Sequence, residues 1–352
     1  MKTYFFFSLL LFVSSSLVAQ DIHFSQPYQA GPFTNPALTG MGQSNTKLSM
    51  VIRSQWGSLL GGNSFKTILA SLEHRETVLQ KDQIGLGFSL FSDRAGELNL
   101  QQNQANLSFS YSKRLVKSSY YHSHLLAGLY AGVGQRSINY DLARWGSQFN
   151  PGKQEIDPTK GAEAIEGMAS DYLYTDAGAG LLWYIKGVKR NSGGGYFGAA
   201  MSHFVGTHRE FRREQRNPLP VKYTIHAGAE LPLGGQMCFL PTLVSYVQGA
   251  AFQANAGAAL SFTLQKTNTI ENELILGAWI RLGNNPVVGQ IKPESFIPVA
   301  RLKFNDWEAG LSYDFPLTAL RSAAIGNGSL ELSLNYSFNK YLDRRMKCPR
   351  LF

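Results

Sequence analysis

The sequence has few charged residues, almost no cysteine, and no long apolar run after its first residues. Of 352 residues, 16% are charged and two are cysteines. No later segment approaches the roughly 18 uninterrupted apolar residues that indicate a membrane-spanning helix. Helix-period stripes and alternation of strands with helices, which are typical of soluble chains of this length, are also missing. These absences argue against a helical membrane protein and against an ordinary α/β enzyme.

Catalytic and metal-binding motifs are equally scarce. The sequence has no GxSxG motif, no phosphate-binding loop and no paired CxxC. The stretch Glu73-His74-Arg75-Glu76 lacks the second histidine that a zinc-protease helix needs. His122 and His124 share a strand face, yet no carboxylate or cysteine lies nearby at metal-ligand spacing. We therefore expect no enzymatic activity, no cofactor and no metal site.

Residues 1–19 have the pattern of a cleaved secretory signal peptide. Lys2 supplies the positive charge, and an apolar run of about ten residues leads to a small-residue exit at Ala19. That run is well short of the roughly 20 residues of a spanning helix. We expect Gln20 to be the new amino terminus.

What the chain does have is alternation with a period of two residues. In 107–112, Leu, Phe and Tyr alternate with Ser, and in 329–338 Leu, Tyr and Phe alternate with Glu, Ser and Asn. One apolar face per strand fits either a β-sandwich or an outer-membrane barrel whose apolar face meets lipid. The period alone leaves both open, so the loops must decide.

Fourteen candidate strands can be counted, within a barrel spanning 48–338. They run near 48–56, 65–73, 83–92, 103–114, 123–135, 174–185, 195–205, 221–231, 237–248, 253–264, 271–282, 294–304, 306–315 and 328–338. Most have the length of a tilted bilayer crossing. With the first mature residue placed in the periplasm, the two longest connections, 136–173 and 206–220, fall outside and every inward turn is short. Long outer loops and short periplasmic turns are typical of outer-membrane barrels, so the sequence predicts an all-β transmembrane barrel.

Aromatic and glycine residues fit this prediction. Aromatic residues near the strand ends suit interfacial girdles; they are Trp56, Tyr111, Tyr120, Tyr121, Trp183, Tyr184, Tyr246, Trp307 and Tyr336. Glycines two apart, such as Gly85 with Gly87, share one face. There they would relieve crowding in the lumen or let the strands curve.

Charge and cysteine suggest partners on both sides of the membrane. The net charge is +9, but no basic helix or aromatic platform for nucleic acid is present, so we expect no nucleic-acid partner. The basic outward stretch 208–216 suits a solvated loop that binds acidic surface glycolipid. The basic tail 339–352 is expected in the periplasm, as a frayed end or a docking segment for a periplasmic partner. Cys238 and Cys348 both fall on the periplasmic side, where a disulfide between them would pin the tail.

The stretch behind the leader carries the most specific signal. The signal is an ordered series with a characteristic spacing: Gln26, the run NPALTG at 35–40, Arg53 and the pair Gln55-Trp56. With the glycine-rich strand 83–98 and the segment DLARWGSQF at 141–149, this pattern resembles the PorP/SprF family of the type IX secretion system of Bacteroidota. The resemblance covers essentially the whole mature chain and is most specific in its first hundred residues.

Residues 20–47 are expected either to fold into or under the lumen or to launch the first strand. Pro36 would hold Asn35 extended, and Gly40 permits a backbone conformation closed to other residues. Arg53 and Gln55 could pair with the segment inside the barrel. The sequence leaves open a lumenal plug, a periplasmic docking segment and a simple launch.

The resemblance implies an outer-membrane accessory of protein secretion, not an enzyme. Its expected partners are the translocon, periplasmic ring or peptidoglycan-binding components, outer-membrane lipid, and cargo of the adhesin or gliding type with a type IX C-terminal signal. Partner or plug contacts are expected at Gln26, Asn35, Pro36, Gly40, Arg53, Gln55 and Trp56, and a cargo surface at Arg144, Trp145 and Gln148. The alternatives are a channel for small or hydrophobic solutes and a purely structural surface anchor.

Overall fold

The computed structural model describes most of the mature chain. It covers residues 21–42, 44–56, 64–79, 82–157, 169–188, 192–205, 219–266, 271–284, 289–317 and 328–338. The expected signal peptide, the basic stretch 208–216 and the tail 339–352 lie outside these residues.

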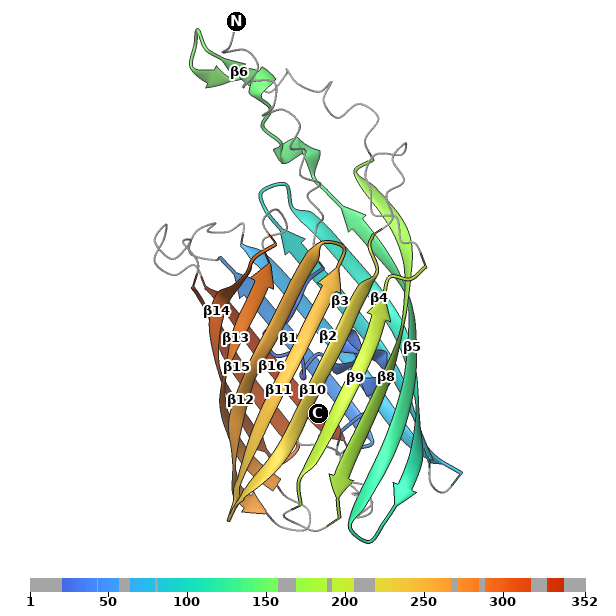
Figure 1. Cartoon of the computed structure of the whole chain (residues 1–352). Coiled ribbons are helices and arrows are strands. Elements are labelled where there is room, and N and C mark those ends of the chain that lie inside the picture. The colour runs from blue at the N-terminus through green and yellow to red at the C-terminus, as the bar shows by residue number, and fades with distance from the viewer. Residues whose placement is uncertain are drawn as a thin grey trace, which may run out of the picture.

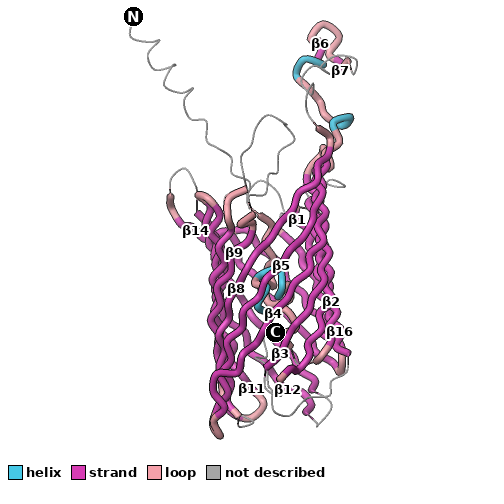
Figure 2. The backbone as a smooth tube through the Cα atoms, turned by 90° about the vertical axis from the view of Figure 1, so that its right-hand side faces the viewer, coloured by secondary structure: helices cyan, strands magenta, loops and turns pink. Residues whose placement is uncertain are grey.

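Fourteen antiparallel strands close into a barrel (Figures 1 and 2). In sheet order, β1 is hydrogen-bonded to both β2 and β16, so the first and last strands meet at a seam. The strands are β1 (Thr46–Gln55), β2 (Phe65–Val78), β3 (Asp82–Ala95), β4 (Leu100–Lys117), β5 (Tyr121–Ser137), β8 (Asp171–Gly187), β9 (Gly194–Ser202), β10 (Lys222–Gly234), β11 (Met237–Gln248), β12 (Ala251–Lys266), β13 (Glu271–Asn284), β14 (Ile291–Phe304), β15 (Trp307–Pro316) and β16 (Ser329–Phe338). The predicted all-β transmembrane barrel is confirmed, with most strands longer than expected.

The connections alternate between two rims. One rim, called here the long-loop rim, carries the connections after β1, β3, β5, β9, β11, β13 and β15. The other, the short-turn rim, carries the remaining turns and the start of β1. The connection from β5 to β8 rises from the long-loop rim as an arm (Figure 1), with 3-10 helices η3 (Tyr140–Leu142) and η4 (Gly146–Gln148) and a hairpin of β6 (Phe149–Asn150) and β7 (Glu155–Ile156).

The wall has an apolar outer face and a polar inner face. On β16, Leu330, Leu332 and Leu334 are 42–47% exposed, while Glu331 and Ser333 between them are 0% and 5% exposed. A soluble sandwich would bury the leucines instead. Large apolar side chains can face outward in this way when lipid is the surrounding solvent.

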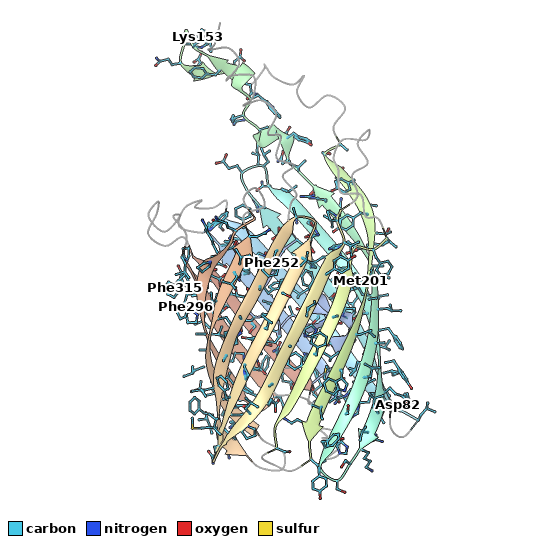
Figure 3. All side chains as sticks on the ribbon, viewed as in Figure 1. Asp82, Lys153, Met201, Phe252, Phe296 and Phe315 are labelled. Atoms are coloured by element: carbon cyan, nitrogen blue, oxygen red, sulfur yellow. The ribbon has the colours of Figure 1, made fainter. Side chains whose placement is uncertain are left out.

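Aromatic side chains on the outer face lie toward the rims. Phe296 and Phe315 lie near the long-loop rim, with Phe252 close to the same level (Figure 3). Two residues predicted for the girdle are instead inside: Tyr184 is 3% exposed and stacks on His124, and Tyr246 alternates with the outward Val247. Tyr184 directly follows the outward Trp183, and neighbours on a strand face opposite sides, so the two cannot both meet lipid.

The chain before β1 occupies the lumen. Residues 21–45, called here the plug, include α2 (Gly31–Thr34) and η1 (Pro36–Leu38), which lie inside the barrel in Figures 1 and 2. The plug starts at the long-loop rim, where Asp21 contacts Lys222 and Gln248, and it joins β1 at the short-turn rim. The lumen is one of the positions that the sequence left open for residues 20–47, and the described residues from Asp21 onward cross it before the first strand begins.

Candidate functional site

The outer end of the plug is held by charge. The Asp21 carboxylate accepts a hydrogen bond from Lys222 Nζ at 2.8 Å and lies 2.9 Å from His203 Nε2. The Nδ1 atom of His203 lies 2.9 Å from the carboxylate of Asp176. The Asp21 backbone N–H donates to Gln248 Oε1 at 2.8 Å. These groups come from β8, β10, β11 and the end of β9, so the plug ties four neighbouring elements together at the long-loop rim.

A buried ion cluster on the wall grips the next residues of the plug. The cluster consists of Arg53, Arg281, Asp314 and Glu331, from β1, β13, β15 and β16. Arg53 pairs with Asp314 at 2.9 Å and with Glu331 at 3.2 Å, and Arg281 pairs with Asp314 at 2.6 Å. All four side chains are at most 6% exposed. The cluster spans the seam, since Arg53 and Glu331 are direct register partners.

The plug adds neutral hydrogen-bonding groups to this cluster. The backbone N–H groups of Ser25 and Gln26 each donate to Glu331 at 2.8 Å. The Ser25 hydroxyl donates to Asp314 at 2.6 Å and accepts hydrogen bonds from Arg53 and from Arg281. Gln26 also donates to Ser312 Oγ at 3.1 Å. Hydrogen bonds to ionised partners are stronger than neutral ones, so this is a firm attachment.

Aromatic residues fill the middle of the lumen. The Tyr28 ring lies 5.8 Å from that of Trp279 and 4.4 Å below the Arg301 guanidinium. Phe33 stacks on Phe91 with ring centroids 5.5 Å apart. Tyr28 and Phe33 thus pack the plug against the wall.

The NPALTG run is a capped turn seated against the opposite wall. Asn35 is extended, with φ −155° and ψ 119°, and its Oδ1 accepts the Ala37 N–H at 2.9 Å. Its Nδ2 lies 3.1 Å from the Leu181 carbonyl and 2.9 Å from His226 Nε2. Gly40 has φ +72°, and its N–H donates to Glu73 at 2.9 Å. The expected roles of Asn35 and Gly40 in the backbone are confirmed.

Glycines on three strands form the groove that receives this turn. A Cβ at Gly85 would lie 2.2 Å from the Thr39 carbonyl oxygen, and one at Gly128 would lie 2.3 Å from the Ala37 nitrogen. A Cβ at Gly180 would lie 2.0 Å from Asn35 Oδ1. A larger residue would therefore displace the plug backbone at Gly85 and Gly128 and the Asn35 side chain at Gly180, and this close approach explains why glycine stands at these inward positions.

The structure brings most of the expected contact residues into the lumen but separates them into two groups. Gln26 and Arg53 meet at the ion cluster, whereas Asn35, Pro36 and Gly40 lie against β2, β3, β5 and β8. Gln55 and Trp56 lie at the long-loop rim, where the Trp56 ring packs edge-on against Phe65 with centroids 5.1 Å apart.

The expected cargo residues lie in the arm. Arg144 is exposed and Trp145 is half-buried, but Gln148 is 7% exposed. The Gln148 side chain accepts the Trp145 N–H at 2.9 Å, and its backbone N–H donates to the Trp145 carbonyl at 3.0 Å. In this structure Gln148 closes the turn, so Arg144 and Trp145 are the members of the set that face solvent.

Cys238 opens β11 at the short-turn rim and is 3% exposed. Cys348 lies outside the described residues, so the disulfide between them stays a prediction.

Sequence reasoning missed the charged groups that hold the plug, namely Asp21 of the plug itself and, on the wall, His203, Lys222, Arg281, Asp314 and Glu331. Each strand member stands at an inward position of the period-two pattern, as Glu331 does between Leu330 and Leu332. A charged side chain between two outward apolar residues of a strand was the available signal.

The described residues contain no candidate for a metal site or for a membrane-spanning helix. Among them, no group of three histidine, cysteine, aspartate or glutamate residues is placed to hold a metal ion. Within the same residues, no helix is long and apolar enough to cross a membrane.

Comparison with known proteins assigns the chain to a family. A model of the type IX secretion system membrane protein PorP/SprF matches residues 16–336. No curated protein matches the chain.

Among solved structures, CdiB from Escherichia coli matches at 10% identity and TM-score 0.46, over 84% of this chain and 63% of that one. The chain thus spans less than two thirds of CdiB. The Ralstonia pickettii toluene transporter TbuX matches at 10% identity and TM-score 0.44, over 88% and 94% of the two chains. At these values the likenesses carry no argument about activity. The family match extends over nearly the whole barrel, and the chain belongs to the PorP/SprF family as an integral outer-membrane component of the type IX secretion system.

Proposed function

We propose that this barrel is an accessory of the type IX system that aids the secretion or surface attachment of specific cargo proteins. The family supports a secretion role, and it is not an enzyme family. The observation that carries the choice against a solute channel is the plug, which crosses the lumen from rim to rim and is packed against both walls. A barrel whose lumen is filled in this way offers binding surfaces to other proteins and no open passage to solutes.

The two rims supply surfaces for different partners. The arm stands well clear of the long-loop rim (Figure 1) and exposes Arg144 together with Leu142 and Phe149, which are 42% and 52% exposed. Cargo of the adhesin or gliding type, arriving outside the membrane, would meet the arm first. The short-turn rim, with the basic tail that follows β16, faces the periplasmic ring and peptidoglycan-binding components.

The test is deletion of the gene in its host, followed by quantitative proteomics of the cell surface and the medium. We expect the loss of one or a few proteins that carry a type IX C-terminal signal, while other secreted proteins stay at their normal level. Complementation with the native gene should restore them, and a gene encoding Arg144→Ala with Trp145→Ala should restore them poorly despite a normal barrel level. An unchanged secretome with altered uptake of a small solute would overturn the proposal in favour of a channel.

A further inference from the structure

We propose that the plug is a withdrawable gate, which leaves the lumen through the short-turn rim and converts the barrel into a passage for small hydrated solutes. This goes beyond the secretion role, because it assigns the lumen a second, conditional state. The inference rests on where the plug is tethered, on how its contacts are charged, and on what its departure leaves behind.

The covalent tether sets the direction of movement. The plug continues into the wall only at Thr46, on the short-turn rim, while Asp21 lies at the other end of the lumen. The sequence predicts cleavage of the leader after Ala19, which would leave Asp21 close to a free chain end. An extended chain reaches roughly 3.3–3.6 Å per residue, so a plug of this length can clear the rim while still attached. The free end then travels through the lumen and leaves on the periplasmic side.

The charges at the seam permit this departure, whereas the ion pair between Asp21 and Lys222 at the long-loop rim has to break. The ion cluster holds two guanidinium groups and two carboxylates in mutual contact, so it is neutral without the plug. Ser25 and Gln26 contribute only hydroxyl, amide and backbone groups, whose places water can take. Unpaired buried charges are costly, and here none is left behind on the seam. Within 21–45, Asp21 is the sole carboxylate, and it lies at the rim.

The attachment of the NPALTG turn is mainly one of shape. Gly85 and Gly128 admit the plug backbone into close contact with the wall, and Gly180 admits the Asn35 side chain. The hydrogen bonds there, from Gly40 to Glu73 and from Asn35 to Leu181, are individually replaceable by water. A groove of this kind holds a chain in register and still lets it slide out along its length.

The emptied lumen would be mainly polar, with two apolar clusters on the wall, around Trp279 and around Phe91, that the plug now covers. Inward residues that face the plug or its surroundings include Ser49, Ser71, Asn106, Ser110, Asn255 and Ser312, all of them buried. Hydroxyl and amide groups of this kind solvate water and ions, and a barrel of this strand number is wide enough to enclose a lumen. The permeant class is therefore hydrated polar solutes, not hydrophobic molecules.

The decisive experiment unseats the plug and measures ion conductance in planar bilayers. Gly128→Leu places a side chain where the Pro36 and Ala37 backbone now lies, and Ala37→Trp creates the same clash from the plug while leaving every strand native. Gly195→Leu is the matched control, because Gly195 lies on β9 between inward positions and a Cβ there meets its nearest atom at 3.4 Å. We expect discrete conductance steps from both plug-clash variants, and none from the native chain or from Gly195→Leu.

The direction of withdrawal is measured with a buried reporter. Ala30 is 2% exposed, and Ala30→Cys is placed in a chain whose native cysteines are replaced by alanine. With Ala37→Trp added, a bulky polymer-linked maleimide should react from the short-turn side of the bilayer and not from the long-loop side. Without Ala37→Trp, neither side should react.

Two results would overturn the gate. One is that the plug-clash variants conduct no ions and the thiol introduced by Ala30→Cys stays unreactive in them. The other is that this thiol reacts from the long-loop side alone. None of these outcomes depends on cargo, so they are distinct from a failure of the secretion test.

Discussion

Replacing Arg53 with leucine is expected to lower the free energy of unfolding of the barrel by about 3–5 kcal/mol, because it leaves Glu331 buried without a cation. Glu331 is 0% exposed, and Arg53 is its ion-pair partner at 3.2 Å. Asp314 keeps Arg281, so the loss concentrates on the seam strand β16 and on the plug residues bonded to Glu331. The urea concentration at the unfolding midpoint measures the effect. Folded and unfolded barrels are distinguished by their different mobilities in unheated gels.

The same variant should expose the plug to protease. Chymotrypsin cleaves after aromatic residues, and Phe24, Tyr28 and Phe33 supply sites within the plug. We expect rapid cleavage there in Arg53→Leu and slow cleavage in the native chain.

Two control variants separate charge from shape at this site. Arg53→Lys keeps the cation but not the planar fork that reaches both Asp314 and Glu331, so a smaller loss is expected. Adding Glu331→Gln to Arg53→Leu removes the stranded charge and should recover part of the stability, as a double-mutant cycle would reveal. An unchanged midpoint together with a protected plug in Arg53→Leu would show that the ion cluster does not hold the seam.

Replacing Asn35 with leucine is expected to cost about 2–4 kcal/mol, since it removes a helix cap and leaves buried polar partners unsatisfied. Asn35 is 0% exposed, and it bonds the Ala37 N–H, the Leu181 carbonyl and His226 at once. Leucine has a similar size but can make none of these bonds. The urea midpoint and the chymotrypsin cleavage rate of the plug report the loss.

The chain offers a matched control in Asn139. Its side chain caps η3 by accepting the Asp141 N–H at 2.9 Å, but it does so in the exposed arm outside the lumen. Asn139→Leu should leave the barrel midpoint and the plug cleavage rate unchanged. Equal effects from the two substitutions would mean that Asn35 acts only as a cap and that its lumenal contacts contribute nothing.

The barrel could be predicted from sequence because its signal is local. Most strands repeat the alternation that 329–338 shows, and lipid requires it strand by strand. The parity of the loops then fixed the direction of each crossing. Tyr184 and Tyr246 were wrongly assigned to the aromatic girdle because only their proximity to a strand end was considered. The face of the strand on which each residue lies was not.

The plug could be predicted only in part, because its contacts join distant parts of the chain. The extended backbone of Asn35 follows from the proline after it, and the positive φ of Gly40 follows from its being glycine. Both are local effects that the sequence alone reveals. The contact between Gln26 and Glu331 spans 305 residues, and no local pattern links them. The path from the long-loop rim to Thr46 was likewise out of reach, because polar aromatic segments can lie equally well beneath a barrel or within it.

The measurement that tests the account most directly is the ion conductance of the purified native chain in planar bilayers. A plug that is packed from Asp21 at one rim to Gly40 near the other should make the inserted barrel silent, as expected for a secretion accessory at rest. A persistently open pore in the native chain would contradict the lumenal plug and would favour a solute channel.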